Sequence, residues 1–569
     1  MANQISEAVF IAGGKQSKGE KAVKDAANLL VNGGVLAVKG EGGFHLAADA
    51  GSVPTVARLR RRKQRNEKPL AIMLADCSSV EQYCFVSQQE ADLLTGSAAP
   101  IVLLRRRSGC NLAPNLAPGL STLGVLLPYT EIQRCLVAKT ELPLVMTSGN
   151  LSEEPLCRDN KEALSRLAEV ADGFLLHDRD IVRRLDDSVA VMAAGEPRLV
   201  RRARGYSSMP ILLTQQVPSL LACGALYKNT FCLASGERAF LSQHMGDLDN
   251  AVAFCCYRDE IERQQRVLKI TPRFALKDLH PGYLSSQFAN SLQLPSLAVQ
   301  HHHAHVGAVM AEYGLEGPLI GVVYDGTGLG TDGTVWGAEV LVVNGKSFWR
   351  AGHLKPVALP GGDAAAKELY RATFGFLYPY WDEFPQFKER LDSCVVRFIE
   401  QQLKQNVNAP LASSMGRLFD AVAALVNLRQ RAGFEGQAAM ELEALIIPCS
   451  ESYPYELKEE AGVLLVDTYE TLQHVYRDFC RGVATGVIAA RFHNTVIDFT
   501  VEIVSKVSCS TGLTRVGLAG GCMQNRYLLE GLQKRLIQAG LTVYIPSAVP
   551  CNDGGLALGQ AAIAAYHFT

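Results

Sequence analysis

The sequence Val299-Gln300-His301-His302-His303-Ala304-His305 places four of the chain's twelve histidines within five positions. In an α-helix, residues four apart lie one above the other on the same face. His301 and His305 would then direct two imidazoles toward one ion, and neutral imidazole nitrogen is a good ligand for zinc or iron. Clustered histidines at a solvated helix start would give the same spacing, so the pattern alone leaves both interpretations open.

The composition is that of an ordinary globular protein, with 569 residues, of which 48% are hydrophobic and 20% charged. This length suggests three or four domain-sized units. The net charge of −1 would recruit neither nucleic acid nor a membrane, and no stretch approaches the roughly 20 apolar residues of a spanning helix. The fifteen cysteines include no C-x-x-C pair, which excludes zinc-ribbon modules. We therefore expect a cytoplasmic protein with no nucleic-acid or membrane partner.

Short apolar runs alternate with amphipathic stretches along the chain, which is typical of α/β proteins. A basic stretch with Gly, Ser and Pro at 204–210 indicates a domain boundary, and a second α/β region follows over 211–569. Residues 380–470 are predicted to be mainly helical. In the first region, the predicted strands are 35–38, 71–74, 101–104 and 144–146, and the predicted helices are 22–31 and 162–171.

The densest charged feature of the first region is the stretch 58–68, where seven of eleven side chains are Lys or Arg. Such a cluster directly before a buried strand is suited to binding phosphates, although a solvated helix face would look the same in isolation. Two glycine-containing turns follow other predicted strands, at 39–45 and at Thr147-Ser148-Gly149-Asn150. Hydroxyl and amide groups beside a permissive glycine allow a ligand to approach closely, which favours the phosphate-binding interpretation.

The stretch 35–49, the cation pattern and the turn at 147–150 resemble the YrdC/Sua5 domain. This resemblance implies an α/β domain over 21–210 that uses ATP to activate a carbamate as an acyl adenylate. In that family the cations hold the ATP phosphates, and the hydroxyl-rich turn lies beside the nucleotide. The residues carried over are Lys63, Arg65 and Lys68 as catalytic cations, and Thr147, Ser148 and Asn150 as nucleotide-binding groups.

The second region has glycine turns of its own, at Asp325-Gly326-Thr327-Gly328, at 518–525 and at 551–555. Backbone N–H groups in such turns, and at the N-termini of the helices that follow, can face phosphate oxygens. An aspartate in the turn can bind a cation. Each turn alone is weak evidence, because similar turns also close ordinary hairpins.

Together with the histidines, these turns resemble the Kae1/TsaD branch of the actin-like (ASKHA) ATPase superfamily. There, an H-x-x-x-H pair and a distant C-terminal aspartate bind one metal that contacts nucleotide phosphate. His302 and His303 point to other sides of the helix, and we expect them to support the ligands or face the substrate. The resemblance implies a metal site of His301, His305 and Asp553 with Asp325 as a fourth ligand, and nucleotide-binding groups at Asp325, Gly326, Thr327, Gly328, Gly520, Gly521 and Asn525.

A YrdC-like module followed by a Kae1-like module, the latter with subdomains at about 211–316 and 317–569, resembles the HypF family of [NiFe]-hydrogenase maturation carbamoyltransferases. The resemblance implies that ATP with Mg²⁺ converts carbamate, supplied from carbamoyl phosphate, into carbamoyl-adenylate. The carbamoyl group would then pass to the C-terminal cysteine of a HypE-like acceptor for cyanide-ligand synthesis. One divalent metal, zinc or iron, is the implied cofactor. Antibiotic O-carbamoyltransferases, with the modules in the opposite order, and tRNA threonylcarbamoylation enzymes, with the modules on separate chains, are the alternatives.

The sequence departs from the family pattern at its start. The family's usual N-terminus has an acylphosphatase domain and a pair of Cys-rich zinc fingers, and neither is recognisable here. We therefore expect residues 1–20 to be a linker remnant of a truncated chain or of a naturally short member. Carbamoyl-phosphate hydrolysis is expected to be missing.

Overall fold

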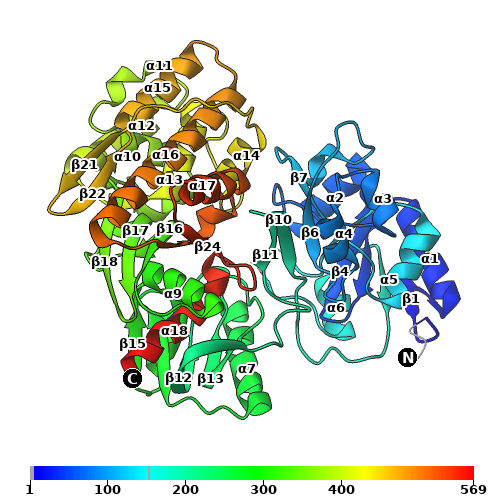
Figure 1. Cartoon of the computed structure of the whole chain (residues 1–569). Helices are drawn as coiled ribbons and strands as arrows, with labels where there is room; N and C mark the ends of the chain where they lie inside the picture. The colour runs from blue at the N-terminus through cyan, green and yellow to red at the C-terminus, as the bar shows by residue number, and fades with distance from the viewer. Residues whose placement is uncertain (1–4, 152–153, 569) are drawn as a thin grey trace. The chain divides into compact units, whose positions relative to one another are not determined.

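The computed structural model describes residues 5–151 and 154–568 (Figure 1). The chain packs as two units: unit 1 comprises Met1–Met209 and Ser242–Arg263, and unit 2 comprises Pro210–Leu241 and Gln264–Thr569. The chain first passes from unit 1 to unit 2 between Met209 and Pro210, next to the boundary predicted between residues 210 and 211. The chain returns to unit 1 at Ser242 and passes to unit 2 again at Gln264. Neither of these two crossings was predicted, and helix α7 (Ala251–Leu268) runs through the last one.

Unit 1 is built on one mixed sheet with eleven strands among the described residues, in the order β11-β10-β6-β7-β5-β8-β4-β3-β9-β1-β2. The four strands predicted from apolar runs correspond to β3, β5, β6 and β8. The strands are β1 (Val9–Ala12), β2 (Lys15–Lys18), β3 (Leu36–Lys39), β4 (Phe44–Asp49), β5 (Ile72–Met73), β6 (Ile101–Arg105), β7 (Thr122–Leu126), β8 (Leu144–Ser148), β9 (Gly173–Leu176), β10 (Val189–Ala193) and β11 (Glu196–Arg201).

Helices cover both faces of this sheet because successive strand residues point to opposite sides. In β3, Leu36 and Val38 pack in the cluster that contains α1 and α5, whereas Ala37 packs in the cluster of α2 and α6. The helix predicted at 162–171 is shorter, since α6 ends at Arg166. The helices are α1 (Glu20–Val31), α2 (Val53–Lys63), α3 (Cys77–Glu81), α4 (Gln88–Thr95), α5 (Glu131–Thr140) and α6 (Asn160–Arg166).

The prediction of a linker over residues 1–20 is wrong for its second half. Strands β1 and β2 form an antiparallel hairpin, and β1 pairs with β9 to extend the sheet. Ala8 is fully buried and Phe10 nearly so, and both pack with α1. The polar sequence 14–19 suggested a linker, but the glycines at 13 and 14 adopt positive φ and make the hairpin turn.

Unit 2 contains two sheets, with the orders β13-β12-β14-β15 and β21-β22-β18-β17-β16-β23-β24, and β19 and β20 join the second sheet through β17. The strands are β12 (Ile211–Ala222), β13 (Cys232–Leu241), β14 (Phe274–Asp278), β15 (Ser296–Val299), β16 (Leu319–Leu329), β17 (Val335–Asn344), β18 (Ser347–Leu354), β19 (Val357–Ala358), β20 (Leu411–Ser414), β21 (Glu456–Glu460), β22 (Val463–Asp467), β23 (Arg515–Ala519) and β24 (Thr542–Tyr544).

Helices α9 (His301–Tyr313) and α18 (Leu556–Phe568) cross between these sheets, as Figure 1 shows. A Cβ atom on Gly559 would lie 1.7 Å from the carbonyl oxygen of Ala304, so only glycine permits this approach. Helix α9 packs on β16 and β17, and α18 packs on β12 and β13. The C-terminal helix therefore covers the first sheet of unit 2.

The remaining helices of unit 2 lie mainly on the second sheet and in the region at 380–470. That region is largely helical as predicted, but it also contains β20, β21 and β22. No helix within residues 5–151 and 154–568 is long and apolar enough to cross a membrane. The helices are α8 (Leu284–Ser291), α10 (Tyr370–Leu377), α11 (Pro385–Lys388), α12 (Ser393–Gln405), α13 (Met415–Leu425), α14 (Gln437–Ala444), α15 (Tyr469–Cys480), α16 (Thr485–Thr511) and α17 (Arg526–Gln538).

Candidate active sites

The histidine run forms the first turns of α9, as its spacing predicts. Gln300 caps the helix, and its side-chain oxygen accepts a hydrogen bond from the His303 backbone N–H at 2.8 Å. The His301 and His305 rings lie 5.0 Å apart between centroids, and both side chains are fully buried. Burial excludes the alternative of histidines on a solvated helix start.

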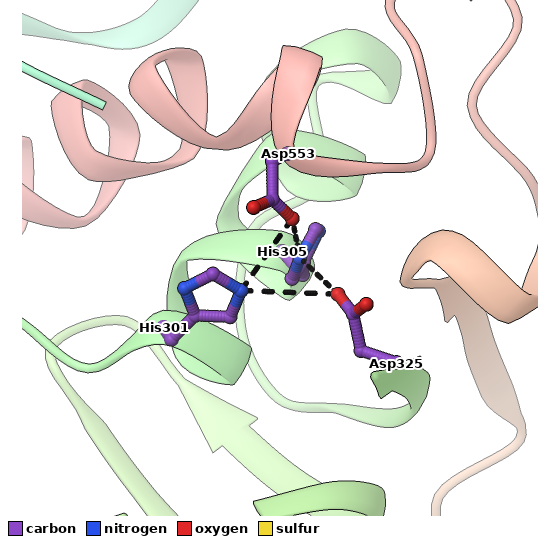
Figure 2. Close-up of side chains that lie close together, drawn as sticks. All are labelled: His301, His305, Asp325 and Asp553. Atoms are coloured by element: carbon purple, nitrogen blue, oxygen red, sulfur yellow. Dashed lines mark ion pairs between the residues drawn. The ribbon is translucent and has the colours of Figure 1, made fainter. Parts of the chain in front are cut away.

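Two aspartates from distant segments meet this histidine pair, as Figure 2 shows. The Asp325 Oδ2 atom lies 3.1 Å from His305 Nε2 and 3.8 Å from His301 Nε2. The Asp553 Oδ1 atom lies 3.5 Å from His305 Nε2 and 3.6 Å from His301 Nε2. One ligand atom from each of these four residues lies within 4.8 Å of the other three, a set that can surround a single metal ion.

The donor set fits a divalent cation. His301 Nε2, His305 Nε2 and Asp325 Oδ2 are buried and have no hydrogen-bond partner, which is costly unless something else satisfies them. Burial disfavours a charged His301, but Asp553 and Asp278 outweigh that effect and hold the pKa of His301 well above its ordinary value. The carboxylates thus favour positive charge at the centre of the cluster, and a metal ion would supply it in place of protons.

A third carboxylate, that of Asp278, orients the His301 ring. His301 Nδ1 lies 2.8 Å from Asp278 Oδ2, and neither side chain is exposed to solvent. Because Nδ1–H donates to Asp278, the Nε2 lone pair is left facing the cluster. Sequence reasoning missed Asp278, although its place at the end of strand β14 is a usable signal.

Asp325 lies inside a strand and not in the turn that the sequence predicts. Strand β16 continues to Leu329, but its pairing with β17 is interrupted between Tyr324 and Gly328. The Asp325 side chain bonds the backbone N–H of Gly326 at 2.7 Å, which holds the other carboxylate oxygen toward the histidines. Gly328 lies against the His301 and His302 rings, whereas Thr327 is exposed.

The glycine pair at 520–521 lies beside the same aspartate. Gly520 has φ +96°, and a Cβ there would lie 2.2 Å from the Tyr324 carbonyl oxygen. A Cβ on Gly521 would lie 3.1 Å from Asp325 Oδ1. These contacts bring the end of β23 to the metal-ligand cluster, so the structure brings together the predicted loops at 325–328, 520–521 and 553.

Three other predicted residues are used within the fold. Asn525 caps α17 by accepting from the Leu528 N–H, and its amide nitrogen lies 2.8 Å from His493 Nε2. His303 Nε2 bonds the Gly345 carbonyl oxygen at 2.9 Å. His302 Nδ1 contacts the Gln300 amide, while its buried Nε2 has no hydrogen-bond partner. The nucleotide-binding role of Asn525 stays a prediction.

In unit 1, Lys63 is held by the turn that follows β8. Its ammonium donates to the Asn150 carbonyl oxygen and to Asn150 Oδ1, both at 2.7 Å, and to the Ser148 carbonyl oxygen at 2.5 Å. Lys63 is 1% exposed, and burial together with nearby Arg65 holds its pKa well below the ordinary value. The predicted catalytic lysine and the predicted nucleotide turn therefore lie in direct contact. Thr147, also buried, precedes them on β8.

The other cations of the basic stretch at 58–68 differ in what they contact. Arg60 is buried and donates to backbone carbonyls of the loops at 65–68 and 115–116, so it supports the fold. Arg65 is half-buried, and burial and Arg201 lower its pKa to about 10. Lys68 is exposed. Arg201 and its ion-pair partner Asp186, 2.8 Å away, were not predicted as site residues, although Arg201 lies in a basic stretch and Asp186 in a stretch of mixed charge.

Relatives with known names match nearly the whole chain. A carbamoyltransferase HypF from Synechocystis sp. is 39% identical over 565 residues, which cover 96% of this chain and 73% of the relative. The chain belongs to the HypF family of carbamoyltransferases. The HypF2 carbamoyltransferase of Cupriavidus necator is 41% identical over 583 residues, covering 94% of this chain and 72% of that protein.

Family models and solved structures agree with this HypF assignment. The models match as telomere recombination (the Sua5/YrdC type) over 28–203, the HypF Kae1-like domain over 215–312, and a carbamoyltransferase Kae1-like domain, second subdomain, over 321–560. A full-length HypF crystal structure in the phosphate- and nucleotide-bound form has TM-score 0.96 and 48% identity, covering 98% of this chain and 74% of that one. The T. kodakarensis HypF structure has TM-score 0.92 and 32% identity, covering 99% and 76%. The predicted fold class is confirmed, and the chain is a carbamoyltransferase with ATP-dependent adenylation.

Proposed function

We propose that this HypF-family chain performs two consecutive steps of [NiFe]-hydrogenase maturation in the cytoplasm. Unit 1 activates carbamate with Mg²⁺–ATP, and unit 2 transfers the carbamoyl group to the C-terminal cysteine of a HypE-like acceptor. The product thiocarbamate is the precursor of a cyanide ligand. The curated relatives are named as carbamoyltransferases, which supports the transfer chemistry.

The first step belongs to the cation cluster of unit 1. A carbamate oxygen attacks the α-phosphorus of ATP, the bond to the β-phosphate bridge breaks, and pyrophosphate leaves with the electron pair. Arg65 and Arg201 lie where positive charge can stabilise the phosphates. Lys63 holds the turn at 148–150 in place, so its first role is to shape the nucleotide site.

The second step belongs to the four-residue cluster of unit 2. The acceptor thiolate attacks the carbamoyl carbon, the C–O bond to AMP breaks, and AMP leaves. His301, His305, Asp325 and Asp553 would hold one zinc or iron ion, whose positive charge would stabilise the adenylate phosphate. Asp278 fixes the His301 ring, and the space beside Gly326 is open, because a Cβ there would meet no atom within 4 Å.

One observation carries this proposal: three buried ligand atoms, His301 Nε2, His305 Nε2 and Asp325 Oδ2, converge on one another without a hydrogen-bond partner. A purely structural cluster would satisfy these atoms internally, because unsatisfied buried polar groups cost on the order of 1–3 kcal/mol each. Their convergence on a shared centre, next to open space at Gly326, favours a metal–nucleotide site.

Two assays on one preparation test the proposal. ATP–pyrophosphate exchange is measured with ammonium carbamate, and transfer of ¹⁴C-carbamoyl is measured on a HypE-like acceptor ending in Cys or, as a matched control, in Ser. We expect carbamate-dependent exchange without any acceptor, and transfer only to the cysteine form. Exchange that does not depend on carbamate, or equal labelling of the serine form, would contradict the proposal.

A further inference from the structure

Glu312 lies on the same face of helix α9 as the two histidines of the metal-ligand cluster. It follows His305 by seven residues and His301 by eleven, and both spacings return to nearly the same direction on a helix with 3.6 residues per turn. With a rise of about 1.5 Å per residue, Glu312 lies roughly 10 Å along the helix axis from His305. One segment of chain can therefore contact this face at two levels.

The Glu312 carboxylate binds the loop that leads to Asp553. Its Oε1 atom accepts hydrogen bonds from the backbone N–H groups of Ser547 and Ala548, at 2.8 and 2.9 Å, and from the Ser547 hydroxyl at 2.9 Å. Its Oε2 atom accepts from the Val549 N–H at 3.2 Å. Hydrogen bonds to an ionised carboxylate are stronger than those between neutral groups. Three consecutive N–H groups on one carboxylate therefore anchor this loop firmly to α9.

The path from this anchor to Asp553 is short and is fixed along its length. Val549 is fully buried and packs with residues of α18. Pro550 follows it and restricts the backbone, because its ring locks φ. The carbonyl oxygen of Cys551 then accepts a hydrogen bond from the Gly520 N–H at 2.8 Å. A shift of the loop at its anchor would therefore be passed on to the backbone of Asp553.

Asp553 depends on this backbone for the position of its side chain. The Asp325 carboxylate is held by the Gly326 N–H at 2.7 Å. In the part of the chain that the structure describes, no backbone N–H group donates to the Asp553 carboxylate, which lies 3.5 Å from His305 Nε2 and 3.6 Å from His301 Nε2. Asp553 therefore lacks the local support that Asp325 has, and its distance from the histidines is set by its loop.

We propose that Glu312 is a positioning residue for the metal site, because it holds the Asp553 loop at the distance from His301 and His305 that a single ion requires. The inference rests on the metal site proposed for unit 2 and adds the group that sets its geometry. Helix α9 then supplies two ligands directly and fixes a third through the loop. Loss of the anchor would leave both imidazoles in place and let the Asp553 carboxylate move away from them.

A double-mutant cycle in zinc affinity tests this role on the full chain, without any measurement of turnover. Zinc affinity is measured for Glu312→Gln, for Asp553→Asn and for the double variant. Glutamine keeps the shape of the side chain, but it loses the charge, and its amide nitrogen cannot accept a hydrogen bond. We expect Glu312→Gln to weaken zinc binding about tenfold, as is usual when a group that orients a ligand is lost. In the Asp553→Asn background, the same change should have no further effect, because Glu312 acts through Asp553.

Further measurements separate positioning from a general loosening of the fold. Cobalt(II) can replace zinc, and its visible absorption reports its ligands, so the spectrum of Glu312→Gln should shift toward that of Asp553→Asn. Glu312→Asp keeps the charge on a shorter side chain and should recover part of the zinc affinity, which also covers poor folding of Glu312→Gln. Glu441→Gln is the matched control. It alters a buried carboxylate that binds Arg429 and Gln437, and it should leave zinc affinity and the cobalt spectrum unchanged.

The outcomes distinguish this role from the metal site on which it rests. Zinc affinity and a cobalt spectrum unchanged in Glu312→Gln would overturn the role of Glu312 and leave the metal site standing. A tenfold loss that persists in the Asp553→Asn background would also overturn it, because Glu312 would then act on the fold and not through Asp553. If the unmodified chain bound neither zinc nor cobalt nor iron(II), the proposed metal site would be refuted, and the role of Glu312 with it.

Discussion

The two candidate sites differ in how their polar atoms are satisfied. In unit 1, the Lys63 ammonium has carbonyl and amide oxygens within hydrogen-bond reach, so the site is held together by the protein itself. In unit 2, the Nε2 atoms of His301 and His305 and one oxygen of Asp325 have no hydrogen-bond partner. This difference is what the proposed function requires, in which the unit 2 site would need a bound cation and the unit 1 site would be preformed for ligands that come and go.

The largest expected effect is at the unit 2 cluster. Replacing His305 by Ala removes one of two imidazole ligands, and we expect carbamoyl transfer to fall by roughly 10³-fold because the charge opposite the adenylate phosphate is lost. Zinc or iron content, measured by mass spectrometry of the purified chain, should fall with it. Carbamate-dependent ATP–pyrophosphate exchange should continue.

A matched control lies on the same helix. His303→Gln keeps a donor for the Gly345 carbonyl and removes no cluster ligand, so metal content and transfer should stay within about twofold of the unmodified chain. If His305→Ala abolished exchange as strongly as transfer, the two sites would not be separable and the comparison would fail.

Lys63→Met tests the preformed site. The variant leaves the Ser148 and Asn150 oxygens unsatisfied, and we expect ATP–pyrophosphate exchange to drop by about 10²-fold because the nucleotide turn loses its support. Metal content should not change. Arg61→Met, an exposed cation on the same helix, is the control and should leave exchange unchanged. If Lys63→Met catalysed ATP–pyrophosphate exchange at the rate of the unmodified chain, the turn at 148–150 would hold its shape without the lysine.

Part of the candidate site in unit 2 could be predicted from the spacing of its residues. Other parts of the site and of the fold could not. The i, i+4 spacing of His301 and His305 places both rings on one helix face whatever the rest of the chain does. Asp278 was missed because its contact joins residues 23 positions apart, through a sheet pairing that the sequence does not display. The hairpin at 9–18 was missed because its polar residues are exposed on an edge strand, where composition resembles a linker.

Asp278→Asn sharpens the contrast with a smaller change. The asparagine can still accept from the His280 N–H, but it holds the His301 tautomer less firmly because the carboxylate charge is gone. We expect the zinc affinity, measured by competition with a chromophoric chelator, to fall about tenfold to 100-fold. Transfer at saturating zinc should recover. An unchanged zinc affinity would show that Asp278 acts in folding only.

The smallest effect concerns stability in unit 1. Burial, with Lys39 and Arg179 nearby, lowers the pKa of His177 from 6.5 to about 4. The folded state therefore keeps this imidazole neutral, and the stability this gives is complete above pH 6.5 and is lost as the pH falls toward 4, where only the unfolded chain takes up the proton. Urea denaturation should show the free energy of unfolding falling by roughly 1–3 kcal/mol more between pH 7 and 4.5 in the unmodified chain than in His177→Gln, which cannot titrate. Parallel losses in both proteins would mean that His177 takes up a proton in the folded state as readily as in the unfolded chain.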